Sequence, residues 1–283
     1  MSIINKDDLE KMDKQTTVLV DCRNMMDKFE ESKRLVQSDE ISGAVHIPQM
    51  PFMFKFDGIN EGRHPLPEQS VIDDLYRTLS NDGQYELLLF ADDNSFFHTR
   101  LYFLFMLYGH DVYLFNDDLN AVREQSGEFH DPDVELPIQF DSADSIFKRD
   151  IHYSMETLEE KMKQNVLLID VRGEDRYLGI TEPIDYKKGH IPGAVNIPNS
   201  LIYTDGLLDL NAMNHALDKF KEYDEVIVYC GSGMSATPMF TLLDHNGINV
   251  KVYTGSFSEW ITDDSNIVET SPNILEGVYF NDK

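Results

Sequence analysis

Residues 18–24 read VLVDCRN and residues 167–173 read LLIDVRG, so an apolar run followed by Asp, one further residue and Arg occurs twice. A second pair of segments follows at nearly the same offset, because GAVHIP at 43–48 is echoed by GAVNIP at 193–198. Two independent landmarks in the same order indicate a duplicated unit. We therefore predict that the two halves of the chain fold as similar domains.

Apolar runs in the two halves also correspond, and the segments between them have a different period. The run at 87–90 matches the run at 226–229, and apolar residues at helical spacing precede the first of them at Ile72, Leu75 and Leu79. Short apolar strands that alternate with helices are typical of a parallel sheet covered on both faces. The predicted fold class is α/β, with two tandem domains that each contain a mainly parallel sheet and helices on both faces.

The segment between the two copies contains prolines and aspartates without a clear period, which is typical of a linker. At 283 residues the chain is long enough for two ordinary domains. We predict a first domain at 1–128, a linker at 129–148 and a second domain at 149–283.

The chain is strongly acidic, with 24 basic and 51 acidic side chains and a formal net charge of −27 at pH 7. Such a charge repels phosphate backbones and anionic headgroups, so we expect neither a nucleic-acid partner nor a membrane partner. An anionic substrate therefore requires a local positive site, and individual Arg and Lys residues near a pocket become important.

The sequence contains no run of roughly 18 apolar residues such as a membrane-spanning helix needs. Its first residues, MSIINKDDLEKMDK, lack the profile of a signal peptide. These features predict a soluble, cytoplasmic protein.

The two cysteines, Cys22 and Cys230, belong to no CxxC or Cys/His spacing, so we expect no metal and no other cofactor. Cys22 aligns with Val171 in the repeat, and this predicts a buried apolar role for its thiol. Cys230 ends a predicted strand and precedes a glycine-rich stretch, whereas the first copy has ADDNS at 91–95.

Open α/β sheets place their ligands at the carboxyl ends of the strands, which is where Cys230 is expected to lie. Glycines allow backbone N–H groups to turn toward the sulfur, and the positive end of a following helix adds to their effect. Both features favour a thiolate nucleophile. The alternative is a core cysteine beside an ordinary turn, but the lack of this loop in the first copy favours one working site.

The sequence resembles the tandem-domain rhodanese and mercaptopyruvate sulfurtransferase family over essentially its whole length. The matching motifs are DVR at 170–172, DRYLG at 175–179, GHIPGAVNIP at 189–198, CGSGMSA at 230–236 and YTGSFSEW at 253–260. The resemblance implies that the Cys230 thiolate takes a sulfane sulfur from a small donor as a persulfide. The acceptor is then a thiol, such as a small thiol or thioredoxin, or cyanide.

The resemblance also suggests residues that bind the donor. Thiosulfate-preferring members have basic side chains after the cysteine, whereas the neutral CGSG found here is typical of members that prefer 3-mercaptopyruvate. Arg176 matches the first of two arginines that bind the donor carboxylate, but the second falls on Asp185, with Lys187 and Lys188 as nearby candidates to replace it. The remaining predicted binding residues are those of the loop: Gly231, Gly233, Met234 and Ser235. The donor is therefore left open, with 3-mercaptopyruvate ahead of thiosulfate.

Three further residues are candidates to assist catalysis through the same resemblance. Ser232 matches a loop serine, His64 matches a histidine in an HxLP setting, and Asp57 is the nearest candidate for an acidic partner. Dual-specificity phosphatases share this domain plan, but they need an arginine at the position of Ala236, so phosphatase activity is excluded. A sulfur-relay or regulatory module without turnover is the alternative function.

Overall fold

Each half of the chain contains a sheet of five parallel strands, as the computed structural model shows for residues 2–55, 61–138, 140, 145–275 and 278. The chain divides by its contacts into two units, Met1–Phe56 with Leu66–Asp150, and Asp57–Pro65 with Ile151–Lys283. The predicted α/β class with parallel sheets is therefore confirmed.

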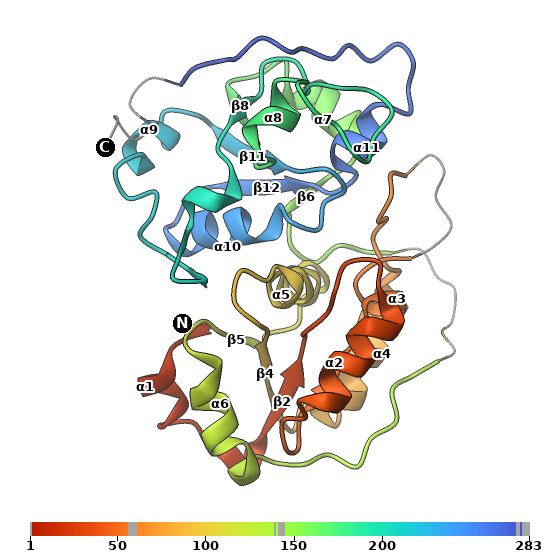
Figure 1. Cartoon of the computed structure of the whole chain (residues 1–283), viewed down its shortest axis with the longest axis vertical. Coiled ribbons are helices and arrows are strands. Elements are labelled where there is room, and N and C mark those ends of the chain that lie inside the picture. Colours follow the sequence, from red (N-terminus) through yellow and green to blue (C-terminus); the bar gives the residue numbers. More distant parts are fainter. Residues whose placement is uncertain (1, 56–60, 139, 141–144, 276–277, 279–283) are drawn as a thin grey trace. The chain divides into compact units, whose positions relative to one another are not determined.

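The first unit has the strand order β1-β5-β4-β2-β3. The strands in that order are β1 (Ile3–Ile4), β5 (Tyr113–Phe115), β4 (Glu86–Phe90), β2 (Thr17–Asp21) and β3 (Val45–His46). The helices are α1 (Lys6–Leu9), α2 (Phe29–Ser38), α3 (Gln49–Phe52), α4 (Gln69–Ser80), α5 (Phe97–Tyr108) and α6 (Leu119–Gln125), with 3₁₀ turns at Lys14–Thr16 and Ser126–Glu128. Figure 1 shows α4 and α6 on opposite sides of β2 and β4, so helices cover both faces of this sheet.

Helix α4 forms where the apolar spacing predicts it. Ile72, Leu75 and Leu79 are all buried on one side of this helix, while several of its polar residues stay partly exposed. Helix α5 is apolar around most of its circumference and is buried along its whole length. The first unit therefore has a core on each face of a sheet whose central strands are buried.

The second unit repeats this plan with the strand order β6-β12-β11-β7-β8. The strands in that order are β6 (His152–Tyr153), β12 (Val250–Tyr253), β11 (Glu225–Tyr229), β7 (Val166–Asp170) and β8 (Val195–Asn196), with a small hairpin of β9 (Tyr203–Thr204) and β10 (Leu207–Leu208). The helices are α7 (Met155–Lys161), α8 (Glu174–Tyr177), α9 (Leu217–Phe220), α10 (Thr237–His245) and α11 (Ser256–Trp260), with a 3₁₀ turn at Asn199–Leu201. Side chains of α7 and α11 share one core cluster with the central strands, and α10 covers the other face (Figure 1).

The register of the strands shows the duplication directly. Asp21 at the end of β2 lies opposite Phe90 of β4, and Asp170 at the end of β7 lies opposite Tyr229 of β11. Because the strands are parallel, their carboxyl ends meet at one edge of each sheet. Cys230 follows Tyr229 directly and therefore lies at this edge in the second unit.

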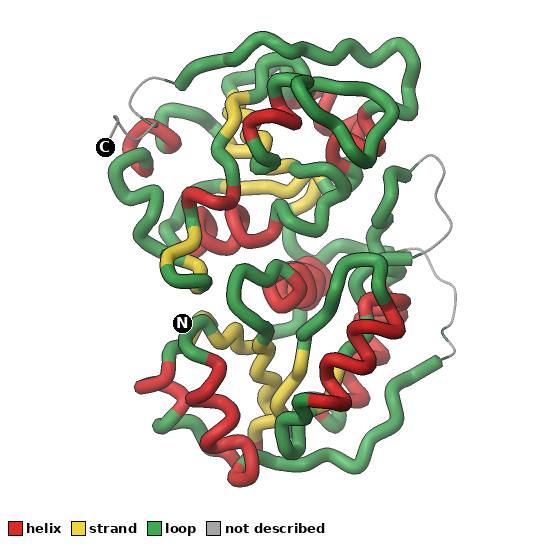
Figure 2. Tube along the Cα trace, viewed as in Figure 1, coloured by secondary structure: helices red, strands yellow, loops and turns green. Residues whose placement is uncertain are grey.

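A long loop leads from α8 to β8 in the second unit. Residues 178–194 contain no helix or strand and run as loop across the unit (Figure 2). This loop carries Glu182 and Asp185, whose carboxylates accept hydrogen bonds from Arg176.

The predicted linker at 129–148 has no helix or strand in its described part, residues 129–138, 140 and 145–148. The boundaries 1–128 and 149–283 stay predictions. None of the described helices is both long and apolar enough to span a lipid bilayer.

Candidate active site

Cys230 begins the loop that leaves the central strand β11, and the cysteine is buried, with 1% of its surface exposed. Residues 231–236 follow as loop, and helix α10 begins only at Thr237, with Pro238 in its first turn. Sequence analysis expects the start of this helix to act on the sulfur. The hydrogen-bonding contacts to the sulfur come from the loop itself and from a second segment, and the effect of the helix start on the sulfur stays a prediction.

Gly233 provides the closest donor to the sulfur. Its backbone N–H donates to Sγ of Cys230 over 3.1 Å. Gly233 has a φ of +78°, and a Cβ at this position would lie 2.1 Å from the carbonyl oxygen of Thr254. Only glycine fits this conformation, which is the one that turns the N–H toward the sulfur. This part of the loop acts as the sequence predicts.

Ser256, at the start of α11, is the second residue that contacts Cys230. Its Oγ accepts the backbone N–H of Cys230 at 3.1 Å and lies 4.0 Å from Sγ. Ser256 has a φ of +56°, in the left-handed region that a residue other than glycine rarely occupies. The motif at 253–260 supports the resemblance, but no sequence signal assigns this contact to Ser256.

Two arginine side chains face Gly231, the residue after the cysteine. A Cβ placed on Gly231 would lie 2.7 Å from Nη2 of Arg63 and 3.5 and 3.6 Å from Nη2 and Nη1 of Arg176. Arg176 is a predicted binding residue, whereas Arg63 is not. A side chain at position 231 would collide with the Arg63 guanidinium. The glycine therefore leaves room beside the cysteine for the guanidinium groups of Arg63 and Arg176.

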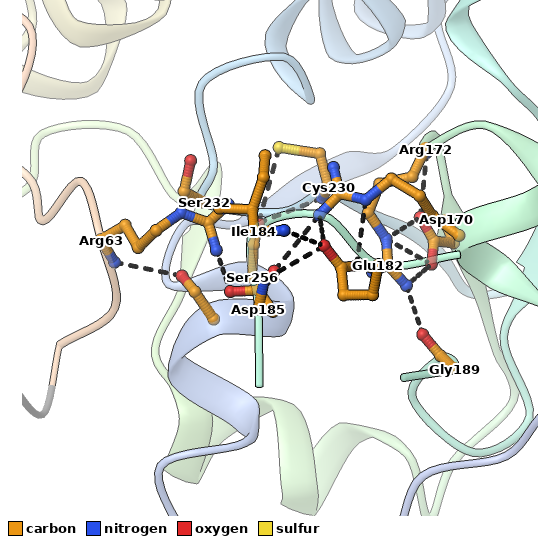
Figure 3. Close-up of polar contacts among 12 residues, drawn as sticks. Arg63, Asp170, Arg172, Glu182, Ile184, Asp185, Gly189, Cys230, Ser232 and Ser256 are labelled. Carbon is orange, nitrogen blue, oxygen red and sulfur yellow. Dashed lines mark hydrogen bonds and ion pairs between the residues drawn. The ribbon is translucent and has the colours of Figure 1, made fainter. Parts of the chain in front are cut away.

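Two buried carboxylates hold these arginines (Figure 3). Glu182 accepts from Nε and Nη2 of Arg176 at 3.0 and 2.8 Å, and Asp185 accepts from Nη2 of Arg176 at 3.2 Å and from Nη1 of Arg63. Burial tends to raise the pKa of Glu182, but the hydrogen bonds from Arg176 and from the backbone of Asp185 and Ile184 outweigh burial and hold this pKa below its usual value. The ionised carboxylate therefore fixes the position of the Arg176 fork.

Ser232 and His64 lie against each other, although they are far apart in the sequence. Nδ1 of His64 and Oγ of Ser232 are 2.6 Å apart, and both residues are buried. The contact arises because residues 61–65 belong to the second unit by their contacts. The structure thus brings together two of the three predicted assisting residues, while Asp57 lies outside the described residues.

The other predicted binding residues have different surroundings. Met234 is buried, and its carbonyl oxygen accepts the hydroxyl of Thr237 at 2.9 Å. Ser235 accepts the side-chain amide of Asn199 at its carbonyl oxygen. These contacts use backbone carbonyl oxygens and stabilise the turn, and the binding role of both side chains stays a prediction.

Neither lysine that could replace the second arginine contacts the loop of Cys230 in the described part of the chain. Nζ of Lys187 lies 3.7 Å from the carboxylate of Asp264. Lys188 forms no ion pair with any described residue. The second guanidinium beside Gly231 belongs to Arg63, and its signals in the sequence are its position next to His64 and the need for local positive charge.

Comparison with known proteins identifies a matching domain and named relatives. Residues 154–263 match the family model of the rhodanese-like domain. A probable 3-mercaptopyruvate sulfurtransferase of Pseudomonas aeruginosa is 28% identical over 282 residues, which cover 89% of this chain and 92% of the relative. A putative thiosulfate sulfurtransferase of Mycobacterium tuberculosis is 26% identical over 235 residues, which cover 77% of this chain and 81% of the relative.

Solved structures show the same fold. The Tum1 protein from Saccharomyces cerevisiae superposes with a TM-score of 0.74 at 20% identity, over 95% of this chain and 98% of the other. A 3-mercaptopyruvate sulfurtransferase from Leishmania major superposes with a TM-score of 0.70 at 21% identity, over 92% of this chain and 74% of the other.

Proposed function

We propose that this chain, whose residues 154–263 match the rhodanese-like domain, moves a sulfane sulfur from 3-mercaptopyruvate, ahead of thiosulfate, to a thiol or cyanide through a persulfide on Cys230. The observation that carries the proposal is the arrangement around the cysteine. An N–H group donates to its sulfur, and two guanidinium groups face the adjacent Gly231. Such a site holds an anionic donor with its sulfur next to a nucleophile.

The proposed reaction has two halves. In the first, the Cys230 thiolate attacks the sulfur of 3-mercaptopyruvate, the carbon–sulfur bond breaks, and its electron pair leaves as the enolate of pyruvate. The proton of the donor thiol then moves to the enolate carbon, which leaves pyruvate and an ionised persulfide. In the second half, an acceptor thiolate or cyanide takes the outer sulfur and returns Cys230 as a thiolate.

Ser232 and His64 are proposed to carry the proton in the first half-reaction, since their side chains form a buried pair next to the cysteine loop. When thiosulfate is the donor, sulfite is the leaving group, and no carbon atom has to be protonated. The two donors therefore make different demands on this pair.

We predict that Ser232→Ala lowers kcat/KM for 3-mercaptopyruvate by about a hundredfold and changes kcat/KM for thiosulfate by less than about threefold. Steady-state kinetics with both donors and cyanide as acceptor provide the measurement. Ser38→Ala in the first unit is the control, because its exposed hydroxyl donates only to the carbonyl oxygen of Leu35 within α2. Equal losses with both donors would contradict the proton-transfer role.

Arg176 is proposed to bind the donor carboxylate with its planar fork. We predict that Arg176→Ala lowers kcat/KM for 3-mercaptopyruvate by roughly ten- to a hundredfold, mostly through KM, with a smaller loss for thiosulfate. Lys219→Ala, which removes an exposed positive charge paired with Glu222 in the second unit, serves as the control and is expected to keep near-normal kinetics. If Arg176→Ala damages the use of both donors equally, the carboxylate-binding role is wrong.

A further inference from the structure

Arg63 is held in the second unit by contacts of its own backbone N–H and of its two neighbours in the sequence. Its own N–H donates to Oγ of Ser258 at 3.1 Å, and the following His64 contacts Ser232. The preceding Gly62 has a φ of +83°, and a Cβ there would lie 2.8 Å from the carbonyl oxygen of Gly255. The segment therefore fits closely against α11 and the cysteine loop, and this fit fixes the direction from which the Arg63 side chain enters the site.

The acidic side chains of the site are buried more deeply than the basic ones. The side chains of Glu182 and Asp185 are almost fully buried, with 0% and 4% exposed, whereas those of Arg176 and Arg63 are 21% and 28% exposed. The two carboxylates thus lie behind the two guanidinium groups. An anion that approaches Gly231 meets the guanidinium groups first, although the whole chain has a net charge of −27.

Asp185 is the residue that links the two arginines. One of its oxygens accepts from Arg63, which Figure 3 labels with Asp185, and the other accepts from Arg176. An arginine at position 185, as the resemblance leads one to expect, would instead repel Arg63 and Arg176. The second positive charge beside Gly231 is at residue 63, and the negative charge of Asp185 orients it.

We propose that Arg63 is the second donor-binding residue of this site and that Asp185 is its counter-ion, which aligns Arg63 with Arg176 and competes with the donor for both. This inference rests on the proposed function for the identity of the donor. The ligand group it specifies is a small oxyanion, such as a carboxylate, that spans the two guanidinium groups beside Gly231. A bound oxyanion accepts some of the hydrogen bonds that the two arginines otherwise donate to Asp185.

Alkylation of Cys230 tests this proposal without any sulfur transfer. Iodoacetate and iodoacetamide are similar in size and react at the same sulfur, but only iodoacetate carries a carboxylate. The quantity measured is the ratio of their alkylation rates on the peptide that contains Cys230, relative to the same ratio for glutathione. The ratio reports the attraction of the site for a carboxylate, and the iodoacetamide rate alone reports whether the loop and the thiol are intact.

We expect Arg63→Met to lower the ratio by roughly three- to tenfold with little change in the iodoacetamide rate. Arg63→Lys should restore part of the ratio, because it returns the charge without the fork. Asp185→Asn, which keeps an oxygen acceptor but removes the competing charge, should raise the ratio. Arg77→Met removes an exposed arginine that pairs with Asp74 in the first unit and should leave the ratio unchanged.

An unchanged ratio in Arg63→Met, or equal changes with both reagents, would overturn the proposal. A fall of the ratio in Asp185→Asn would overturn the counter-ion role. These results are independent of the proposed sulfur transfer, which is tested by the activity of variants at Cys230. A site that attracts carboxylates but transfers no sulfur would refute the proposed function alone.

Discussion

Replacement of Cys230 by serine is expected to reduce sulfur transfer from both donors by at least about a thousandfold, to the background rate. The reason is that the persulfide needs a sulfur atom at this position, and a serine oxygen is too weak a nucleophile to replace it. Intact-protein mass spectrometry after incubation with donor provides a direct measurement. The unmodified protein should gain the mass of one sulfur atom, and the Cys230→Ser variant should gain none.

Cys22→Val is the matched control for this experiment. Cys22 is fully buried beside the first sheet, and burial raises the pKa of its thiol well above the usual value, so it stays protonated and unreactive. Valine already occupies the equivalent position in the second unit, at Val171, and should fit without strain. Full activity in Cys230→Ser, or loss of the added sulfur in Cys22→Val, would contradict the assignment of Cys230.

The fold could be predicted because the repeat is visible in short segments that have one structural meaning. The DCR and DVR segments end β2 and β7, and in both cases the aspartate lies opposite the last residue of the neighbouring strand. The loop of Cys230 could be recognised because its backbone conformation requires glycine at particular positions. Gly233 needs a positive φ and free space at Cβ, and both requirements leave a trace in the sequence.

Other parts of the site could not be predicted, because they depend on distant contacts. Arg63 reaches Asp185 across more than a hundred residues of sequence, through a short segment whose contacts place it in the second unit. Ser256 contacts the cysteine only because its backbone takes a φ that serine rarely adopts.

The shared aspartate and arginine of the two copies support the sheet edges rather than the chemistry. Arg172 donates to Asp170 through Nε and Nη2, to the carbonyl oxygen of Gly189 at 2.7 Å and to Glu182 at 3.3 Å. Its guanidinium also lies 4.1 Å from the centre of the Phe257 ring. Asp170 and Arg172 are both buried away from water, and each side chain neutralises the charge of the other.

We therefore predict that Arg172→Met lowers the free energy of unfolding of the second unit by about 3–5 kcal/mol, because it leaves a buried carboxylate without its partner. Trp260, the only tryptophan of the chain, lies in the core of this unit, so its fluorescence during urea unfolding provides the measurement. Arg77→Met is the control, since its ion pair is exposed and contributes less than about 1 kcal/mol.

A second change separates the charge from the lost packing. Asp170→Asn removes the buried negative charge but keeps the oxygen that accepts the backbone N–H of Arg172 at 2.9 Å. If the unpaired charge causes the destabilisation, adding Asp170→Asn to Arg172→Met should recover a large part of the lost free energy, because a neutral amide is far less costly to bury than a carboxylate. If the double variant is no more stable than Arg172→Met, the loss comes from packing against Phe257. The shared pair would then stabilise each sheet edge mainly through contact area.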